Sequence, residues 1–116
     1  MSMSFKTLLD NCEEADNMIT TGWKNKNNTS GRKCICGSWK EHWIRFNHFK
    51  YLWPSKCSVN GCNNRATLGA HVINGNVAGE FIVPMCDSCN KRREEFDLDY
   101  GTSFASANKS KTCEKY

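Results

Sequence analysis

The chain has 116 residues and a formal net charge of +4, which suits one domain and excludes a multidomain enzyme or a doubly wound cofactor-binding fold. Leu, Ile, Val and Phe together number only 20 residues, so the aliphatic core is thin. Small chains of this kind are usually stabilised by disulfides or by metal, and the eight cysteines could supply either.

The chemistry of these cysteines depends on the compartment. The N-terminal region has acidic residues from Asp10 onward and lacks the apolar run of a signal peptide. No apolar stretch is long enough to span a membrane. We therefore expect a cytoplasmic protein, in which clustered cysteines more often bind metal than form disulfides. A disulfide framework is the alternative.

The first predicted element is an amphipathic helix within residues 1–22. Apolar residues recur at helical spacing over residues 4–19, with acidic residues mostly on the other side. The apolar positions are Phe5, Leu8, Leu9, Cys12, Ala15 and Ile19. Residues 23–33 are polar and rich in Asn, which predicts a linker.

Residues 34–54 combine a Cys34-x-Cys36-Gly37 turn with a second helix. Ser38 and Glu41 have the spacing of a capping box, which predicts a helix start at Ser38. Pro54 ends the pattern. One face of this helix is aromatic and carries Trp39, His42, Trp43, Phe46 and Phe49.

Residues 55–100 predict two strands and a third helix. The strands are expected over residues 66–73 and 80–85, with a reversal at Asn74-Gly75-Asn76, where positive φ angles are tolerated. The helix should begin near Asp87 and run to about Leu98. Residues 101–116 are rich in Ser and Thr and hold few apolar groups, and we expect them to be extended or loose. We expect residues 1–116 to form a single small α+β domain.

Four cysteines form two closely spaced pairs, Cys57-x4-Cys62 and Cys86-x2-Cys89. A structural zinc ion takes four such ligands in a tetrahedron, so these pairs predict a bound Zn²⁺. The order of cysteine pair, β-hairpin and helix predicts a treble-clef zinc finger with a ββα unit, flanked by the N-terminal helices.

A second zinc site is a further hypothesis. Its ligands would be Cys34, Cys36, His42 and Cys113, which would join both ends of the chain to its middle. The alternative is that Cys34 and Cys36 only pack against neighbouring residues.

Charge is unevenly distributed along the chain. Residues 23–93 hold twelve Lys or Arg against three acidic residues, interleaved with seven aromatic residues between Trp23 and Trp53. This pattern suits a polyanion such as nucleic acid. A solvated basic face over an aromatic core explains it equally well.

The segments CSVNGC, LGAHV and FIVPMCDSCNKR within residues 57–93 resemble the zinc-bearing HNH, or ββα-metal, endonucleases. The resemblance implies that His71 is the general base, that Asn90 helps to hold a catalytic Mg²⁺ or Mn²⁺, and that Lys91, Arg92 and Arg93 face phosphates on the first turns of the third helix. A structural role, or a role as zinc ligand, is the alternative for His71.

Two positions depart from the HNH pattern. Ala70 stands where the family has a metal-binding acid, and the asparagine that orients the histidine should fall near Glu80 or Phe81. Glu80 is a candidate replacement for the lost carboxylate. The wider pattern from Cys34 onward is similar to small uncharacterised bacterial and phage proteins of HNH-like type.

We therefore expect a zinc-binding, HNH-like protein that binds nucleic acid. It is also a candidate metal-dependent phosphodiester nuclease with His71 as general base, although its catalytic metal site is incomplete. The alternative is a catalytically inactive zinc adaptor or inhibitor that binds a protein or nucleic acid, and a third is a redox sensor using Cys12 or Cys34 and Cys36. We expect neither a membrane partner nor a small-molecule cofactor.

Overall fold

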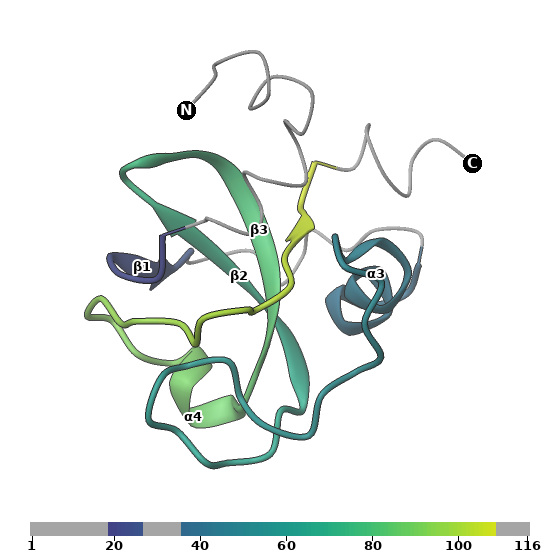
Figure 1. Cartoon of the computed structure of the whole chain (residues 1–116), viewed down its shortest axis with the longest axis horizontal. Helices are drawn as coiled ribbons and strands as arrows, with labels where there is room; N and C mark the ends of the chain where they lie inside the picture. The colour runs from purple at the N-terminus through teal and green to yellow at the C-terminus, as the bar shows by residue number, and fades with distance from the viewer. Residues whose placement is uncertain (1–18, 27–35, 109–116) are drawn as a thin grey trace, which may run out of the picture.

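The computed structural model describes residues 19–26 and 36–108, and these form a small α+β structure (Figure 1). A four-stranded antiparallel sheet has the strand order β1-β2-β3-β4. Its strands are β1 (Trp23–Asn25), β2 (Leu68–Asn74), β3 (Val77–Met85) and β4 (Ala105–Ser106). The helices are α3 (Trp39–Phe46) and α4 (Asp87–Asn90). The helix expected over residues 4–19 lies, apart from Ile19, outside the described residues.

The expected hairpin is confirmed as β2 and β3, although both strands differ in their bounds from the prediction. The Asn76 backbone N–H donates to Asn74 Oδ1 (2.9 Å), and the Asn74 side-chain amide donates to Thr21 O (2.8 Å). The reversal is therefore closed by its own asparagine and joined to the segment that leads into β1. In the ladder, Ala70 pairs with Val83 and His71 pairs with Ile82.

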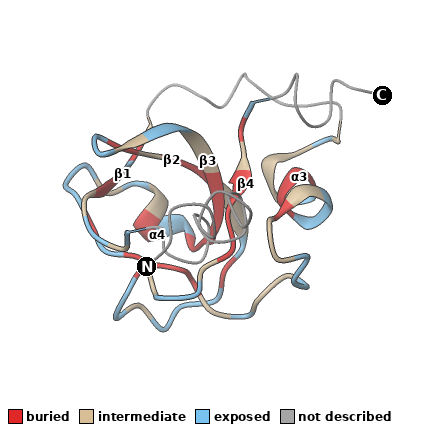
Figure 2. Ribbon diagram, turned by 45° about the horizontal axis from the view of Figure 1, so that its top comes forward, coloured by how far each residue is buried: buried red, intermediate tan, exposed pale blue. Residues whose placement is uncertain are grey.

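The sheet has two differently covered faces, because successive side chains of a strand point to opposite sides. Ala70, Val72 and Val83 lie in one buried cluster together with Trp23, Phe104 and three of the cysteines. Ile82 lies in a second cluster with Trp43 of α3. Buried residues accordingly concentrate in the strands between α3 and α4 (Figure 2). The cysteines gather on one face, and α3 covers the other.

Helix α3 begins where the sequence predicts. Ser38 is the N-cap, and its Oγ accepts from the Glu41 backbone N–H (3.1 Å). The predicted continuation through Phe49 toward Pro54 is wrong, because the backbone becomes extended at Asn47 and the helix ends at Phe46. The buried Asn47 side chain donates to both Trp43 O (3.0 Å) and Tyr51 O (3.1 Å), which turns the chain back.

Two further predictions are corrected around β1. Trp23–Asn25 is an edge strand rather than part of a linker, and residues 27–33 lie outside the described residues. Helix α4 has four residues and does not reach Leu98. The Asn25 side-chain amide donates to Cys89 O (2.9 Å) and Arg92 O (3.0 Å), so it occupies carbonyls that a longer helix would use.

The segment expected to be extended or loose is extended where the structure describes β4, but it is packed rather than loose. Ala105–Ser106 forms β4, and Phe104 and Ala105 are buried. The segment contains too few apolar residues for its sequence to indicate a strand. Among the described residues, no helix combines the length and the apolar character needed to cross a membrane.

Candidate metal centre

The two cysteine pairs meet in one cluster on the face of the sheet opposite α3. The sulfur atoms of Cys57, Cys62, Cys86 and Cys89 all lie within 4.8 Å of one another, and Cys62 Sγ is 3.8 Å from Cys86 Sγ. A tetrahedral site with Zn–S bonds of ~2.3 Å has sulfur–sulfur edges of ~3.8 Å. The four cysteines could therefore hold one metal ion such as zinc.

Local backbone structure positions each pair. Cys62 N–H donates to Val59 O (3.0 Å) in a turn that Gly61 completes with a positive φ of 85°. Cys86 directly follows β3 and is the N-cap of α4, which brings Cys89 alongside it. Ser58 N–H donates to Pro84 O (3.0 Å). This bond joins the loop that contains Cys57 and Cys62 to the end of β3, which leads directly into Cys86.

The thiols of the cluster cannot all ionise together without a cation. Burial opposes the Cys86 thiolate, but hydrogen bonds from Ser88, the Cys89 amide and Asn64 outweigh it and lower the pKa of Cys86 to about 6. Burial and the neighbouring thiols raise the pKa of Cys89 to about 12. Burial also raises the pKa of Cys57. A divalent cation among the sulfurs would remove this conflict, because it neutralises the thiolate charge.

The donor set indicates which kind of ion suits the cluster. All four candidate ligands are sulfur, and three of the cysteines are buried while Cys62 is half-buried. Hard cations such as Mg²⁺ prefer oxygen ligands, whereas four thiolates in a closed site are typical of structural zinc. The residues therefore fit Zn²⁺ and leave no open position for a reacting water.

His71 lies on the face covered by α3. Its Nε2 is 2.7 Å from Glu80 Oε1, and its side chain is only 2% exposed. The Trp39 ring packs edge-on against the imidazole, with 5.3 Å between the ring centroids. Glu80 Oε2 also lies 3.6 Å from Lys26 Nζ. The structure thus brings Glu80 to His71, a contact for which the sequence offered no positional argument.

The structure does not bring His71 and Asn90 together. Asn90 ends α4, and Cys86 and Cys89 of the same segment pack in the cluster on the face opposite His71. Ala70, which stands at the position of the HNH metal-binding acid, is 1% exposed within that cluster. A carboxylate there would be buried among apolar groups.

The three predicted phosphate-binding residues follow α4 rather than lie in its first turns. Lys91 is the C-cap, and its Nζ lies 3.0 Å from Asp87 Oδ2. Arg92 Nε lies 4.0 Å from Glu94 Oε2, and its guanidinium lies over the Phe96 ring. Arg93 is exposed.

Only part of the second proposed zinc site lies within the described residues. Cys36 is half-buried and His42 is buried, whereas Cys34 and Cys113 lie outside the described residues. His42 Nε2 is 2.7 Å from Ser106 O, and a carbonyl can only accept, so this nitrogen carries a proton. Burial lowers the pKa of His42, although the bond to Ser106 opposes the shift.

Two asparagines that organise the structure escaped the sequence analysis. Asn25 connects β1 to the carbonyls around Cys89. Asn47 connects the end of α3 to Tyr51 and Ser103. Each is more than nine-tenths buried. An asparagine at a helix end or within an alternating strand is a weak signal, because most asparagines in such positions face water.

Comparison with protein families, with curated proteins and with solved structures found no match for this chain.

Proposed function

We propose that this protein is a zinc-stabilised module that binds nucleic acid through a basic edge and does not cleave it. The basic edge is defined by five residues, which lie in or directly after β1 and in the segment after α4: Lys24, Lys26, Lys91, Arg92 and Arg93. The observation that carries the proposal is the hydrogen bond from Asn25 to Arg92 O (3.0 Å), which holds these two basic segments side by side next to the cysteine cluster.

Acidic partners on the basic edge do not prevent this role. Lys26, Lys91 and Arg92 lie near Glu80, Asp87 and Glu94 respectively. Ion pairs that remain accessible to solvent in this way contribute ~1 kcal/mol or less and are screened by salt. A row of phosphates can therefore compete for the same cations, with the release of counterions as an additional driving force.

The placement of His71 supports binding without cleavage. A general base must come within hydrogen-bond reach of the water that it activates, and a metal ion must neutralise the developing charge. His71 is covered by Trp39 and lies on the opposite face from the four sulfurs. The donors of the cluster are thiolates that would enclose a structural ion rather than present one to a substrate.

Binding to labelled duplex DNA, single-stranded DNA and RNA should weaken as salt rises from ~50 to ~200 mM. Fluorescence anisotropy measures this dependence. Arg93→Glu should reduce the slope of log K against log salt by about one to two, because it removes one cation and adds one anion at the basic edge.

Lys50→Glu is the matched control, since it changes net charge equally at an exposed position after α3. Equal weakening by both variants would show that net charge alone drives binding and would contradict a role for the basic edge. The absence of binding to any nucleic acid, together with salt-insensitive binding to one protein, would favour the adaptor or inhibitor hypothesis.

A metal-dependent nuclease is the second candidate, and the distance of 2.7 Å between His71 Nε2 and Glu80 Oε1 favours it. A carboxylate that contacts a histidine orients the ring and increases its basicity. Glu80 would then replace the asparagine that the HNH resemblance leads one to expect near this position.

Plasmid and single-stranded DNA incubated with Mg²⁺ or Mn²⁺ distinguish the two candidates. We expect no cleavage by the wild type or by His71→Ala of equal zinc content. Metal-dependent cleavage that His71→Ala abolishes and Glu80→Gln reduces would establish the nuclease and contradict the non-catalytic proposal.

A further inference from the structure

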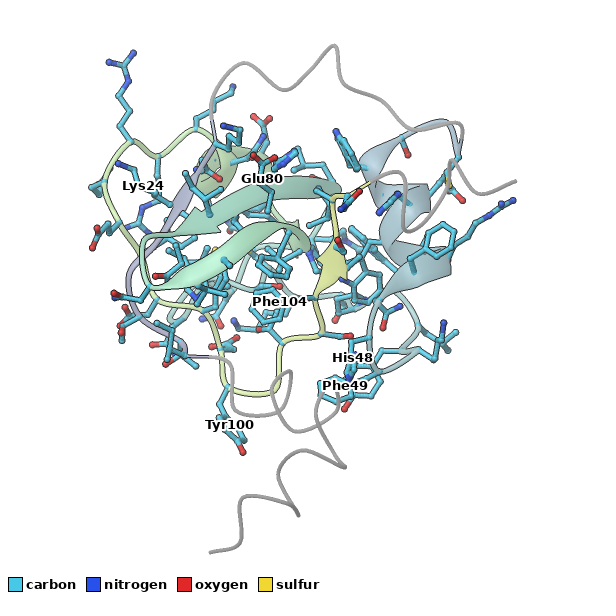
Figure 3. The ribbon with its side chains drawn as sticks, turned by 90° about the horizontal axis from the view of Figure 1, so that it is seen from above. Lys24, His48, Phe49, Glu80, Tyr100 and Phe104 are labelled. Carbon is cyan, nitrogen blue, oxygen red and sulfur yellow. The ribbon has the colours of Figure 1, made fainter. Side chains whose placement is uncertain are left out.

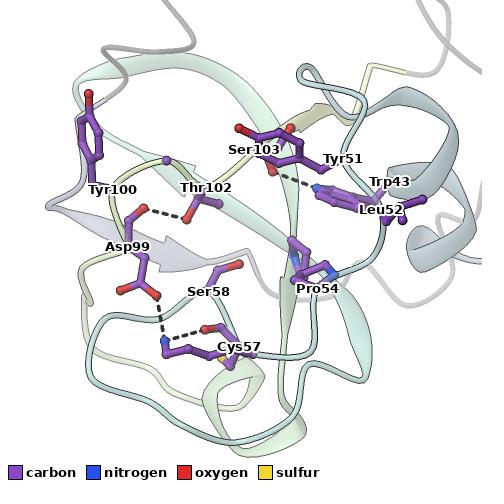
Figure 4. Close-up of a pocket in the computed structure, with 13 residues that line it drawn as sticks. Trp43, Tyr51, Leu52, Pro54, Cys57, Ser58, Asp99, Tyr100, Thr102 and Ser103 are labelled. Carbon is purple, nitrogen blue, oxygen red and sulfur yellow. Dashed lines mark hydrogen bonds and ion pairs between the residues drawn. The ribbon is translucent and has the colours of Figure 1, made fainter.

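A groove of about 220 Å³ lies between the segment of residues 51–58 and the loop of residues 99–103 (Figure 4). Its lining includes three large apolar side chains that are open to solvent: Tyr51 is 54% exposed, Leu52 89% and Tyr100 83%. Tyr100 projects away from the sheet (Figure 3). The described residues expose only two other large apolar side chains, Ile19 and Ile44. This concentration around one groove indicates an interaction surface.

Hydrogen bonds hold the two walls of the groove in place. Asn47 Oδ1 accepts from the Tyr51 backbone N–H and from Ser103 Oγ, both at 2.8 Å. Trp43 Nε1 donates to Ser103 O (2.8 Å). The groove is therefore shaped before an occupant arrives, which lowers the entropic cost of binding.

Leu52, the most exposed of these side chains, stands between two anchored neighbours. On one side, the Asn47 side chain bonds both the N–H and the carbonyl of Tyr51. On the other side, Trp53 Nε1 donates to Ala66 O (3.0 Å). A leucine that is held in water on a fixed segment can be buried with little further loss of entropy, and its burial stabilises a contact.

The size of the groove and the position of Leu52 indicate which occupant it takes. Pockets for small molecules usually exceed ~300 Å³, and this groove is smaller, so it suits one or two apolar side chains of a protein. Leu52 of a second copy is such a side chain. Because Leu52 and the groove belong to the same surface, a two-fold axis buries both leucines at once, and the contact closes with two copies.

The charges of the two walls complement each other in such a contact. Lys56 is the charged residue of the segment 51–58, and Asp99 is that of the loop 99–103. Lys56 Nζ lies 2.7 Å from Asp99 Oδ2, yet the two side chains remain 41% and 36% exposed. A two-fold axis that lays one wall over the opposite wall of the other copy brings each Lys56 to an Asp99. The basic edge, in contrast, would repel its own copy.

We propose that this face is the interface of a symmetric dimer, in which Leu52 of each copy enters the groove of the other. The proposal goes beyond nucleic-acid binding. It uses no residue of the basic edge, so either proposal can fail without the other.

Sedimentation velocity of the full chain between ~1 µM and ~1 mM covers the affinities of weak complexes. We expect the mass to rise with concentration from that of one chain toward that of two. Leu52→Ser should raise the dissociation constant about a hundredfold, because the symmetric contact loses two buried leucines. Leu52 is 89% exposed, so the variant should fold. Ile44→Ser is the matched control, since Ile44 is 39% exposed, does not line the groove and should not affect the dimer.

Two results of this experiment would overturn the proposal. A chain that stays monomeric at ~1 mM would leave the groove to a different protein. A dimer that Leu52→Ser does not weaken would have to form through another surface.

Nuclear Overhauser effects between copies test how the two chains meet. In a mixture of chains with ¹³C-labelled leucine methyl groups and unlabelled chains, isotope-filtered spectra report only contacts between copies. We expect cross-peaks from the Leu52 methyl groups to the rings of Tyr51 and Tyr100. Their absence in a sample that sediments as a dimer would contradict the insertion of Leu52 into the groove and overturn the proposal.

Discussion

Removal of bound metal should abolish the cooperative unfolding transition of this protein. Without the metal, the four sulfurs, which lie within 4.8 Å of one another, would be buried thiols with no metal–sulfur bonds between them. The aliphatic core around them is too thin to replace those bonds. Structural zinc contributes an apparent ~10–16 kcal/mol in zinc-finger peptides, which is as large as the whole stability of an ordinary domain, ~5–15 kcal/mol. Circular dichroism during heating, with and without a strong chelator, measures the effect.

Cysteine variants make the metal prediction specific. Cys89→Ser should lose the ion and the cooperative transition, whereas Cys36→Ser, which changes a half-buried cysteine outside the cluster, should retain both. Native mass spectrometry should count one zinc ion per chain, and a count of two would support the second site. An unchanged melting curve after complete chelation would show that the cluster is not structural.

Gly69→Ala should destabilise the protein by about 2–3 kcal/mol. A Cβ at this position would lie 2.6 Å from the Trp39 carbonyl carbon and 2.8 Å from the Lys40 backbone nitrogen. These atoms belong to the first turn of α3, so a shift of a single side chain cannot relieve the clash. The helix would have to move off β2, which would loosen its packing on Ile82. Denaturant-induced unfolding measures the change.

Gly75→Ala provides the matched control for Gly69→Ala. It adds the same methyl group in the hairpin reversal, where no atom lies within 4 Å of the new Cβ. We expect its stability to stay within ~0.5 kcal/mol of the wild type. Equal stability of the two variants would contradict the close approach of α3 to β2.

Elements whose signals are local were predictable. The Ser38 cap depends on residues three apart, and Asn74-Gly75-Asn76 closes its turn with its own side chain. The cysteine cluster was also predictable, because two ligand pairs of short spacing leave few arrangements other than a shared centre. The treble-clef form of that centre remains a prediction.

Elements that depend on distant partners were mispredicted or left unassigned. β1 contains three residues and β4 contains two. Strands this short are too brief for the alternation of apolar and polar side chains to be recognised in the sequence. Helix α4 stops early because the side-chain amide of Asn25 donates a hydrogen bond to the Cys89 carbonyl. These two residues are 64 positions apart in the chain. Helical spacing around Phe96 and Leu98 was misleading, since these residues form isolated bridges with Trp23 and Val59.

By itself, the sequence determined the α+β class, the hairpin, the start of α3 and the four cysteines that could hold a metal. Only the tertiary structure decided that Glu80 meets His71, that His71 and the cysteines lie on opposite faces of the sheet, and that a groove forms between residues 51–58 and 99–103. The physical reason is the range of the interactions. Caps, turns and ligand pairs act between near neighbours, whereas strand register and face assignment depend on contacts between residues far apart in the chain.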